Sequence, residues 1–124
     1  MKLKKTSFTE YFGITYIILA GGGNKIQKHV KKHFNHDLII DSNGCCTVLY
    51  DKRTIIISIT EKHIYDIPLF VHEAYHAVNF SCDIIRAEMQ GTEFETYLIQ
   101  YLCIKYLTDI LNVNHRNFTE IFEK

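Results

Sequence analysis

The sequence predicts an α+β fold: a small sheet of three or four strands with three main helices, in a single domain over residues 1–124. Three stretches rich in β-branched and aromatic residues predict strands, at residues 8–20, 46–50 and 54–60. Three longer stretches that begin with a helix-capping residue predict helices, at residues 24–34, 66–80 and 92–113. With 124 residues, 47% of them hydrophobic, the chain can bury one core without disulfide bonds.

At the N-terminal end, residues 8–20 predict one strand that ends at the three glycines of residues 21–23. Asn24 then predicts the start of a helix that runs through residue 34. A strand, a glycine turn and a helix also occur together in phosphate-binding sites. The glycines here follow neither the GxGxxG nor the GK[ST] pattern, so we interpret the segment as a tight strand-to-helix connection.

The middle of the chain predicts a hairpin that leads into the second helix. Residues 37–41 predict a short strand, and residues 41–44 have the composition of a turn. Residues 46–50 and 54–60 predict two strands joined by the short turn at residues 51–53.

The second helix carries the sequence HEAYH at residues 72–76, which has the HExxH spacing. Asp66 can cap the start of this helix, and Pro68 fits its first turn. Residues 69–80 are apolar almost all round, which predicts that the helix is buried.

The spacing of the motif indicates a metal site. Residues i and i+4 of a helix lie on one face, so His72 and His76 can bind one metal ion, usually zinc. Glu73 lies about 100° around the helix, where it can reach a water on the metal without being a ligand. These residue types make up hydrolytic zinc machinery, with Glu73 as the general base. The alternative is a pair of core histidines satisfied by hydrogen bonds, since unpaired buried polar groups are costly.

A third protein ligand is expected from the last helix, which Thr92 can cap. Glu93 and Glu95 lie in its first turn, and Glu93 shares a face with Tyr97 whereas Glu95 lies on another. A carboxylate on the Tyr97 face would close a His-His-Glu site and leave the fourth position open for water. Acidic residues also favour a helix N-terminus electrostatically, so either glutamate could serve that purpose alone.

Residues 71–78 together with residues 93–102 resemble the small phage-encoded metallopeptidases, short gluzincin-like proteins with an HExxH motif. The second motif of that family has a glutamate, two variable residues, a small residue, a tyrosine and a leucine. In this chain the glutamate falls on Glu93, the small residue on Thr96 and the aromatic on Tyr97. The resemblance therefore favours Glu93 as the third zinc ligand and implies a minimal zincin-like fold. Thr96 departs from the usual alanine.

The resemblance implies a zinc-dependent peptidase. Zinc on His72, His76 and Glu93 would lower the pKa of a bound water toward neutrality. Glu73 would accept the proton of that water and later protonate the leaving amine. Tyr97 is a candidate for contact with the oxyanion or the substrate.

The expected partner is a peptide or protein substrate. In zinc peptidases the strand before the metal helix borders the cleft and can pair with an extended peptide. The resemblance alone implies this role for residues 54–60. The phage resemblance implies the cytoplasm of a bacterial host cell or the virion as location, and phage structural proteins as further partners. Two alternatives remain open: a non-catalytic component of a phage particle that zinc stabilises, and a module that binds nucleic acid or a regulatory partner through the basic first helix.

The formal net charge is zero, but residues 1–36 carry seven lysines and a single glutamate. Such a basic surface could touch nucleic acid, although a solvated face is the commoner outcome, and we expect no nucleic-acid partner. His29 and His33 are also spaced i and i+4. The lysines around them would repel a cation, so we interpret this helix as an exposed basic face rather than a metal site.

The four cysteines predict a reducing, cytosolic setting. Cys45 and Cys46 are adjacent, which disfavours a disulfide between them, and Cys82 and Cys103 lie in apolar helical stretches typical of a core. No stretch approaches the length of a membrane span, so no membrane partner is expected.

Overall fold

The computed structural model describes residues 1–10, 12–40, 43–86 and 93–113. Four strands form one mixed sheet in the order β1-β2-β4-β3. These strands are β1 (Lys4–Thr9), β2 (Thr15–Gly21), β3 (Gly44–Leu49) and β4 (Thr54–Thr60). The helices are α1 (Gly23–Phe34), α2 (Ile67–Ile85) and α3 (Glu93–Lys105). The predicted α+β class, with a small sheet and three main helices, is confirmed.

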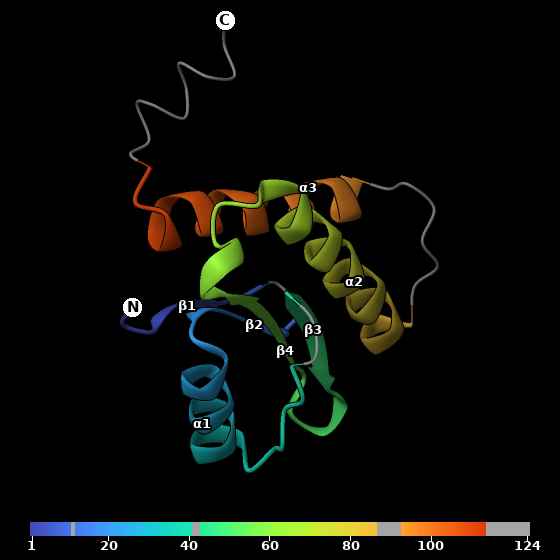
Figure 1. Ribbon diagram of the computed structural model, residues 1–124. Coiled ribbons are helices and arrows are strands. Elements are labelled where there is room, and N and C mark those ends of the chain that lie inside the picture. Colours follow the sequence, from blue (N-terminus) through green and yellow to red (C-terminus); the bar gives the residue numbers. More distant parts are fainter. Residues whose placement is uncertain (11, 41–42, 87–92, 114–124) are drawn as a thin grey trace, which may run out of the picture.

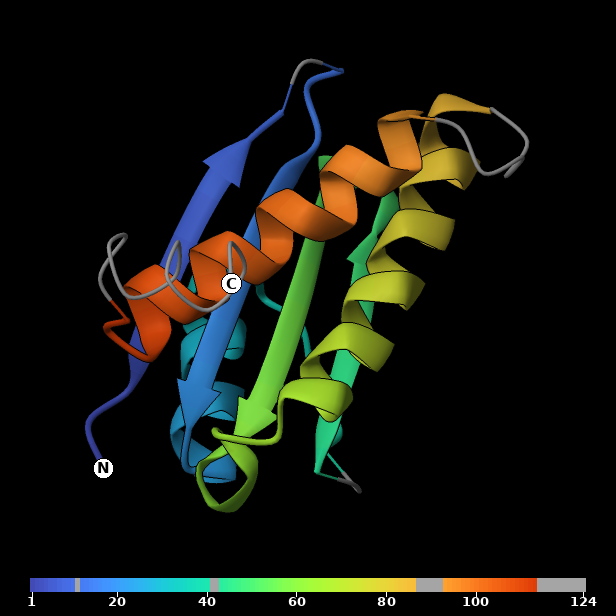
Figure 2. The ribbon, with the colours of Figure 1, turned by 90° about the horizontal axis from the view of Figure 1, so that it is seen from above.

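The helices cover the two faces of the sheet unequally, with α1 on one face and α2 and α3 on the other (Figure 1). In the view from above, α2 lies over the β3 side of the sheet and α3 crosses obliquely toward β1 (Figure 2). Side chains alternate along β4, so that Ile55 and Ile57 enter the core under α2 and α3, whereas Ile56 enters the core under α1.

The prediction of a single strand over residues 8–20 is wrong, because its described residues belong to two strands of a hairpin. β1 and β2 pair antiparallel, with Phe8 opposite Tyr16. In the turn, the Gly13 N–H donates to the Glu10 oxygen and the Glu10 N–H donates to the Ile14 oxygen, both at 3.0 Å. Gly13 has a φ of 79°, a conformation that glycine adopts without steric cost.

The tight connection after β2 is confirmed, since α1 begins two residues beyond the end of that strand. The N-cap is Gly22 rather than Asn24. α1 ends at Phe34, and its C-cap Asn35 has a left-handed conformation with φ of 51°. The short strand predicted at residues 37–41 is wrong for residues 37–40, which have no regular structure, and residue 41 lies outside the described residues. The hairpin of β3 and β4 is confirmed, with a 3₁₀ turn at Tyr50–Lys52 between them.

β4 lies in the interior of the sheet, where it pairs parallel with β2 and antiparallel with β3. Both sides of β4 are therefore hydrogen-bonded, and the expectation that residues 54–60 pair with an extended peptide is wrong. The strand at the edge of the described sheet on this side is β3, which packs against α2.

α2 begins where it was predicted to begin. Asp66 is its N-cap and accepts a hydrogen bond from the Leu69 N–H at 3.1 Å, and Pro68 lies in the first turn. Burial differs from the prediction, because the sheet and α3 cover only part of the helix surface. Val71 is 39% exposed and Tyr75 50% exposed, so α2 has an open face.

α3 continues as a π-helical turn at Tyr106–Ile110. Tyr106 is fully buried, stacks on Phe70 of α2 with ring centroids 4.1 Å apart, and donates a hydrogen bond to the Ile64 backbone oxygen. These contacts fasten the end of the last helix to the start of α2. The predicted cap Thr92 lies outside the described residues. All four cysteines are free thiols. Among the described residues, no helix combines the length and apolar character needed to cross a membrane.

Candidate metal centre

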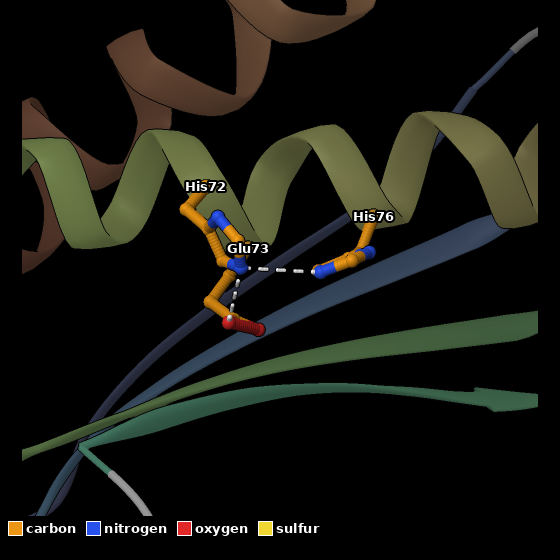
Figure 3. A group of neighbouring side chains, drawn as sticks. All are labelled: His72, Glu73 and His76. Carbon is orange, nitrogen blue, oxygen red and sulfur yellow. Dashed lines mark hydrogen bonds and ion pairs between the residues drawn. The ribbon is translucent and has the colours of Figure 1, made fainter.

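α2 brings three groups of the metal-ligating type together, two on its open face and one buried on its inner side. His72, Glu73 and His76 each offer one ligand atom, and these atoms all lie within 4.8 Å of one another. Figure 3 shows all three side chains on the same side of α2, with the Glu73 carboxylate nearest the strands. The helix spacing alone produces this arrangement, as the HExxH motif predicted.

The distance between the two imidazoles fits a shared metal ion. The Nε2 atoms of His72 and His76 are 3.2 Å apart. Two nitrogens bound to a tetrahedral zinc at about 2.0–2.1 Å would be separated by about 3.3 Å. The ring planes are nearly perpendicular, at 86°, and the rings do not stack face to face. The donor set therefore fits a metal ion such as zinc.

Glu73 differs from the histidines in its surroundings. Its side chain is 8% exposed, whereas that of His72 is 66% exposed. One carboxylate oxygen lies 3.9 Å from Nε2 of His72. A carboxylate held at this distance, on the inner side of the imidazole pair, can accept a proton from a water placed between them.

The inner wall of the site comes from β3. A Cβ atom on Gly44 would lie 3.6 Å from Cγ of Glu73, so the edge strand and α2 are in close contact here. Burial raises the pKa of the Cys46 thiol, and the nearby Glu73 carboxylate raises it further. Cys46 therefore stays a neutral thiol beside the carboxylate at physiological pH. Neither Gly44 nor Cys46 could be connected to the site from the sequence, because no short-range pattern links β3 to α2.

The structure does not bring the predicted third ligand to the histidines. Glu93 is exposed at the start of α3 and does not belong to the cluster of His72, Glu73 and His76. Figure 2 shows that α3 starts beside the C-terminal end of α2. Glu95 is buried, and its charge adds to the effect of burial in raising the pKa of the Cys82 thiol. The assignment of Glu93 as a zinc ligand stays a prediction.

Tyr97 also lies apart from the cluster. It is 62% exposed and lines an apolar groove of about 440 Å³ between α3 and β1, together with Phe8, Phe94, Leu98, Tyr101 and Ile104. None of the three clustered residues of α2 lines this groove. A contact of Tyr97 with an oxyanion or substrate at the histidines therefore has no support from its position.

No family model, curated protein or solved structure matches this chain. The interpretation of the site rests on the chemistry of three side chains. Two exposed imidazoles can bind a metal ion, and a buried carboxylate beside them can act as a base. This donor set is not specific to zinc, since imidazole also suits copper, iron and nickel.

Proposed function

We propose that this protein is a zinc-dependent hydrolase that cleaves peptide bonds. The observation that carries the proposal is the geometry on α2: imidazole nitrogens 3.2 Å apart, with a carboxylate oxygen 3.9 Å from one of them. His72 and His76 hold the metal in this proposal, and resemblance to the phage-encoded metallopeptidases supports Glu93 as the third ligand.

Zinc in such a site supplies Lewis acidity, which lowers the pKa of water toward neutrality and polarises a carbonyl group. The chain itself supplies the proton transfers. Glu73 takes a proton from the attacking water at its carboxylate and then gives it to the leaving amine. Its burial under the imidazoles keeps that carboxylate in place, while the exposure of His72 leaves the approach from solvent open.

The substrate of this proposal is an extended peptide. β3 is the edge strand beside α2, and its Gly44 packs against Glu73. A peptide that adds to this edge by backbone hydrogen bonds would run alongside the metal-binding residues. In this proposal β3, rather than β4, is the strand that pairs with the substrate peptide. The resemblance further supports action in a bacterial host cell, on peptides or on proteins of a phage.

The test combines metal analysis with a cleavage assay. Protein purified without added metal should contain about one zinc per chain, and His72→Ala should lose it, because one of two imidazole ligands is gone. The wild type should cleave members of a peptide library, and Glu73→Gln should bind zinc without cleaving. Zinc in both proteins with cleavage by neither would instead support the second candidate, a zinc-stabilised structural component of a phage particle. A wild type without zinc would reject both.

A further inference from the structure

A second site candidate lies on the opposite face of the sheet from α2, between α1 and the edge strand β1 (Figure 1). Here the protein surface forms a pocket of about 350 Å³. Its polar lining comes from three consecutive residues of β1 and two histidines of α1: Lys5, Thr6, Ser7, His29 and His33. Its apolar lining comes from Ile17 and Phe34. Among the residues that the structure describes, no acidic side chain lines the pocket.

The alternation of β1 aims two of these side chains at α1. Thr6 faces the other side of the sheet, where its hydroxyl donates to Asp109 at 2.6 Å. Lys5 and Ser7, the residues on either side of Thr6, therefore face α1. On α1, His29 and His33 are one helical turn apart and their ring centroids are separated by 4.3 Å. An ammonium, a hydroxyl and two imidazoles thus meet at one pocket.

The charge of this pocket is positive and uncompensated. Within the described part of the chain, Lys31 pairs with Asp37, whereas Lys5 and Lys32 form no ion pair. Burial lowers the pKa of His29, and the charges of His33, Lys5 and Lys32 lower it further. A positive field of this kind repels a cation and attracts an anion. The pair of histidines is therefore better suited to an anion than to a metal ion.

We propose that this pocket binds the phosphoryl group of a small phosphorylated compound. Lys5 provides the charge, and Ser7, His29 and His33 donate hydrogen bonds to the phosphoryl oxygens, which are strong acceptors. Ile17 and Phe34 contact the rest of the ligand. The volume lies in the range of small-molecule sites. The concave shape and apolar part favour a small ligand over an extended nucleic-acid backbone.

The experiment is an NMR titration of the histidine ring protons with inorganic phosphate. Saturable shifts are expected at His29 and His33 but not at His72 and His76. Lys5→Ala should weaken phosphate binding by roughly 10-fold, the effect of losing a charged hydrogen-bond partner. Lys28→Ala is the matched control: it removes the same charge from an exposed position on α1 that does not line the pocket, and should change binding by less than about 2-fold. A phosphate ester that binds more tightly than inorganic phosphate would identify the ester as the natural class of ligand.

Several outcomes would overturn the proposal. Absence of saturable shifts at His29 and His33 would remove the site. Equal losses of phosphate affinity in Lys5→Ala and Lys28→Ala would mean that binding is only general charge attraction. A single-stranded oligonucleotide that displaces phosphate, and whose binding depends equally on both lysines, would indicate a nucleic-acid surface. A variant with both His72→Ala and His76→Ala is titrated with zinc alone; shifts at His29 and His33 would make the pocket a metal site. His29 and His33 lie on the opposite face of the sheet from His72 and His76. The results of the phosphate titration therefore do not depend on the hydrolase proposal.

Discussion

Gly44 of β3 packs against Glu73 of α2, and a Cβ atom at position 44 would lie 3.6 Å from Cγ of the glutamate. The same atom would lie 3.1 Å from the Ser58 backbone oxygen and 3.0 Å from Cδ1 of Ile59. Glycine therefore lets the edge strand approach both its neighbour β4 and α2. The inner wall of the candidate metal centre depends on this close approach.

We expect Gly44→Ala to lower the free energy of unfolding by about 1–2 kcal/mol, the cost of overpacking a tight interior position. The Ile59 side chain can shift, but the Ser58 oxygen belongs to the sheet backbone and cannot rotate away. Urea unfolding of both proteins measures the difference. Gly23→Ala is the control, because a Cβ atom there meets nothing within 4 Å. Equal stability of Gly44→Ala and the wild type would contradict the packing described here.

The segment before α2 accepts a buried hydrogen bond from the Tyr106 hydroxyl at the Ile64 backbone oxygen. We expect Tyr106→Phe to cost about 1–2 kcal/mol of stability, because the Ile64 carbonyl loses its buried donor while the stacking on Phe70 is kept. Thermal and urea unfolding would measure this loss. Tyr97→Phe, at a position 62% exposed, should be nearly neutral. Equal losses of stability in Tyr106→Phe and Tyr97→Phe would mean that the hydrogen bond to Ile64 does not stabilise the fold.

Local signals explain why α2 could be predicted. The Asp66 cap, Pro68 and the spacing of His72 and His76 depend only on residues within a few helical turns. The hairpin of β3 and β4 is local in the same sense. The turn at Gly13 was missed because the β-branched and aromatic residues continue on both sides of it, and composition does not mark where such a run folds back.

Long-range pairing explains what could not be predicted. β4 occupies the interior of the sheet because it pairs with β2, and nothing within β4 itself encodes that neighbour. The edge position of β3, and with it the role of Gly44, follows from the same pairing. The open face of α2 is a related case: the apolar residues around Val71 and Tyr75 predict burial, but a sequence does not state how many sides of a helix are covered.

The contact between β1 and the last helix should depend on pH through Asp109. Hydrogen bonds from Lys105 and Thr6 lower the pKa of this carboxyl. Its charged form therefore stabilises the folded state above the unfolded pKa of about 4, and the contribution is lost as the pH falls through the lower, folded pKa. Asp109→Asn should unfold at lower temperature than the wild type at pH 7, and the difference should shrink in acid.

Thermal unfolding across pH 2–7 would measure this trend. Asp51→Asn, which removes a carboxylate from the exposed turn between β3 and β4, serves as the control and should shift little at any pH. A difference for Asp109→Asn that stayed constant down to the lowest pH would mean that its charge does not contribute.

The third ligand can be identified by comparing two glutamates. The family resemblance predicts that Glu93→Gln weakens zinc binding by about 10-fold or more, whereas Glu95→Gln, buried beside Cys82, leaves it nearly unchanged. Competition with a chelator measures both affinities. Since Glu93 lies outside the cluster on α2, such a loss would require α3 to approach the histidines when zinc binds. An unchanged affinity in Glu93→Gln would remove Glu93 from the ligand set, and the reverse ranking would transfer the role to Glu95.

A comparison of the variants Glu73→Gln and His72→Ala separates an enzyme from a structural protein. If Glu73 is the general base, its amide replacement keeps the zinc and the fold, because Gln is nearly isosteric and Glu73 is not a ligand in this proposal. Hydrolysis is then lost, since an amide cannot accept the proton. His72→Ala should lose both zinc and the thermal stability that zinc provides. Unfolding temperatures with and without a chelator, measured beside peptide cleavage, separate the two functions. A Glu73→Gln protein that still cleaves peptides as fast as the wild type would end the hydrolytic role of Glu73. If a chelator lowers the stability of the wild type, and neither the wild type nor Glu73→Gln cleaves any peptide, the metal has a structural role alone.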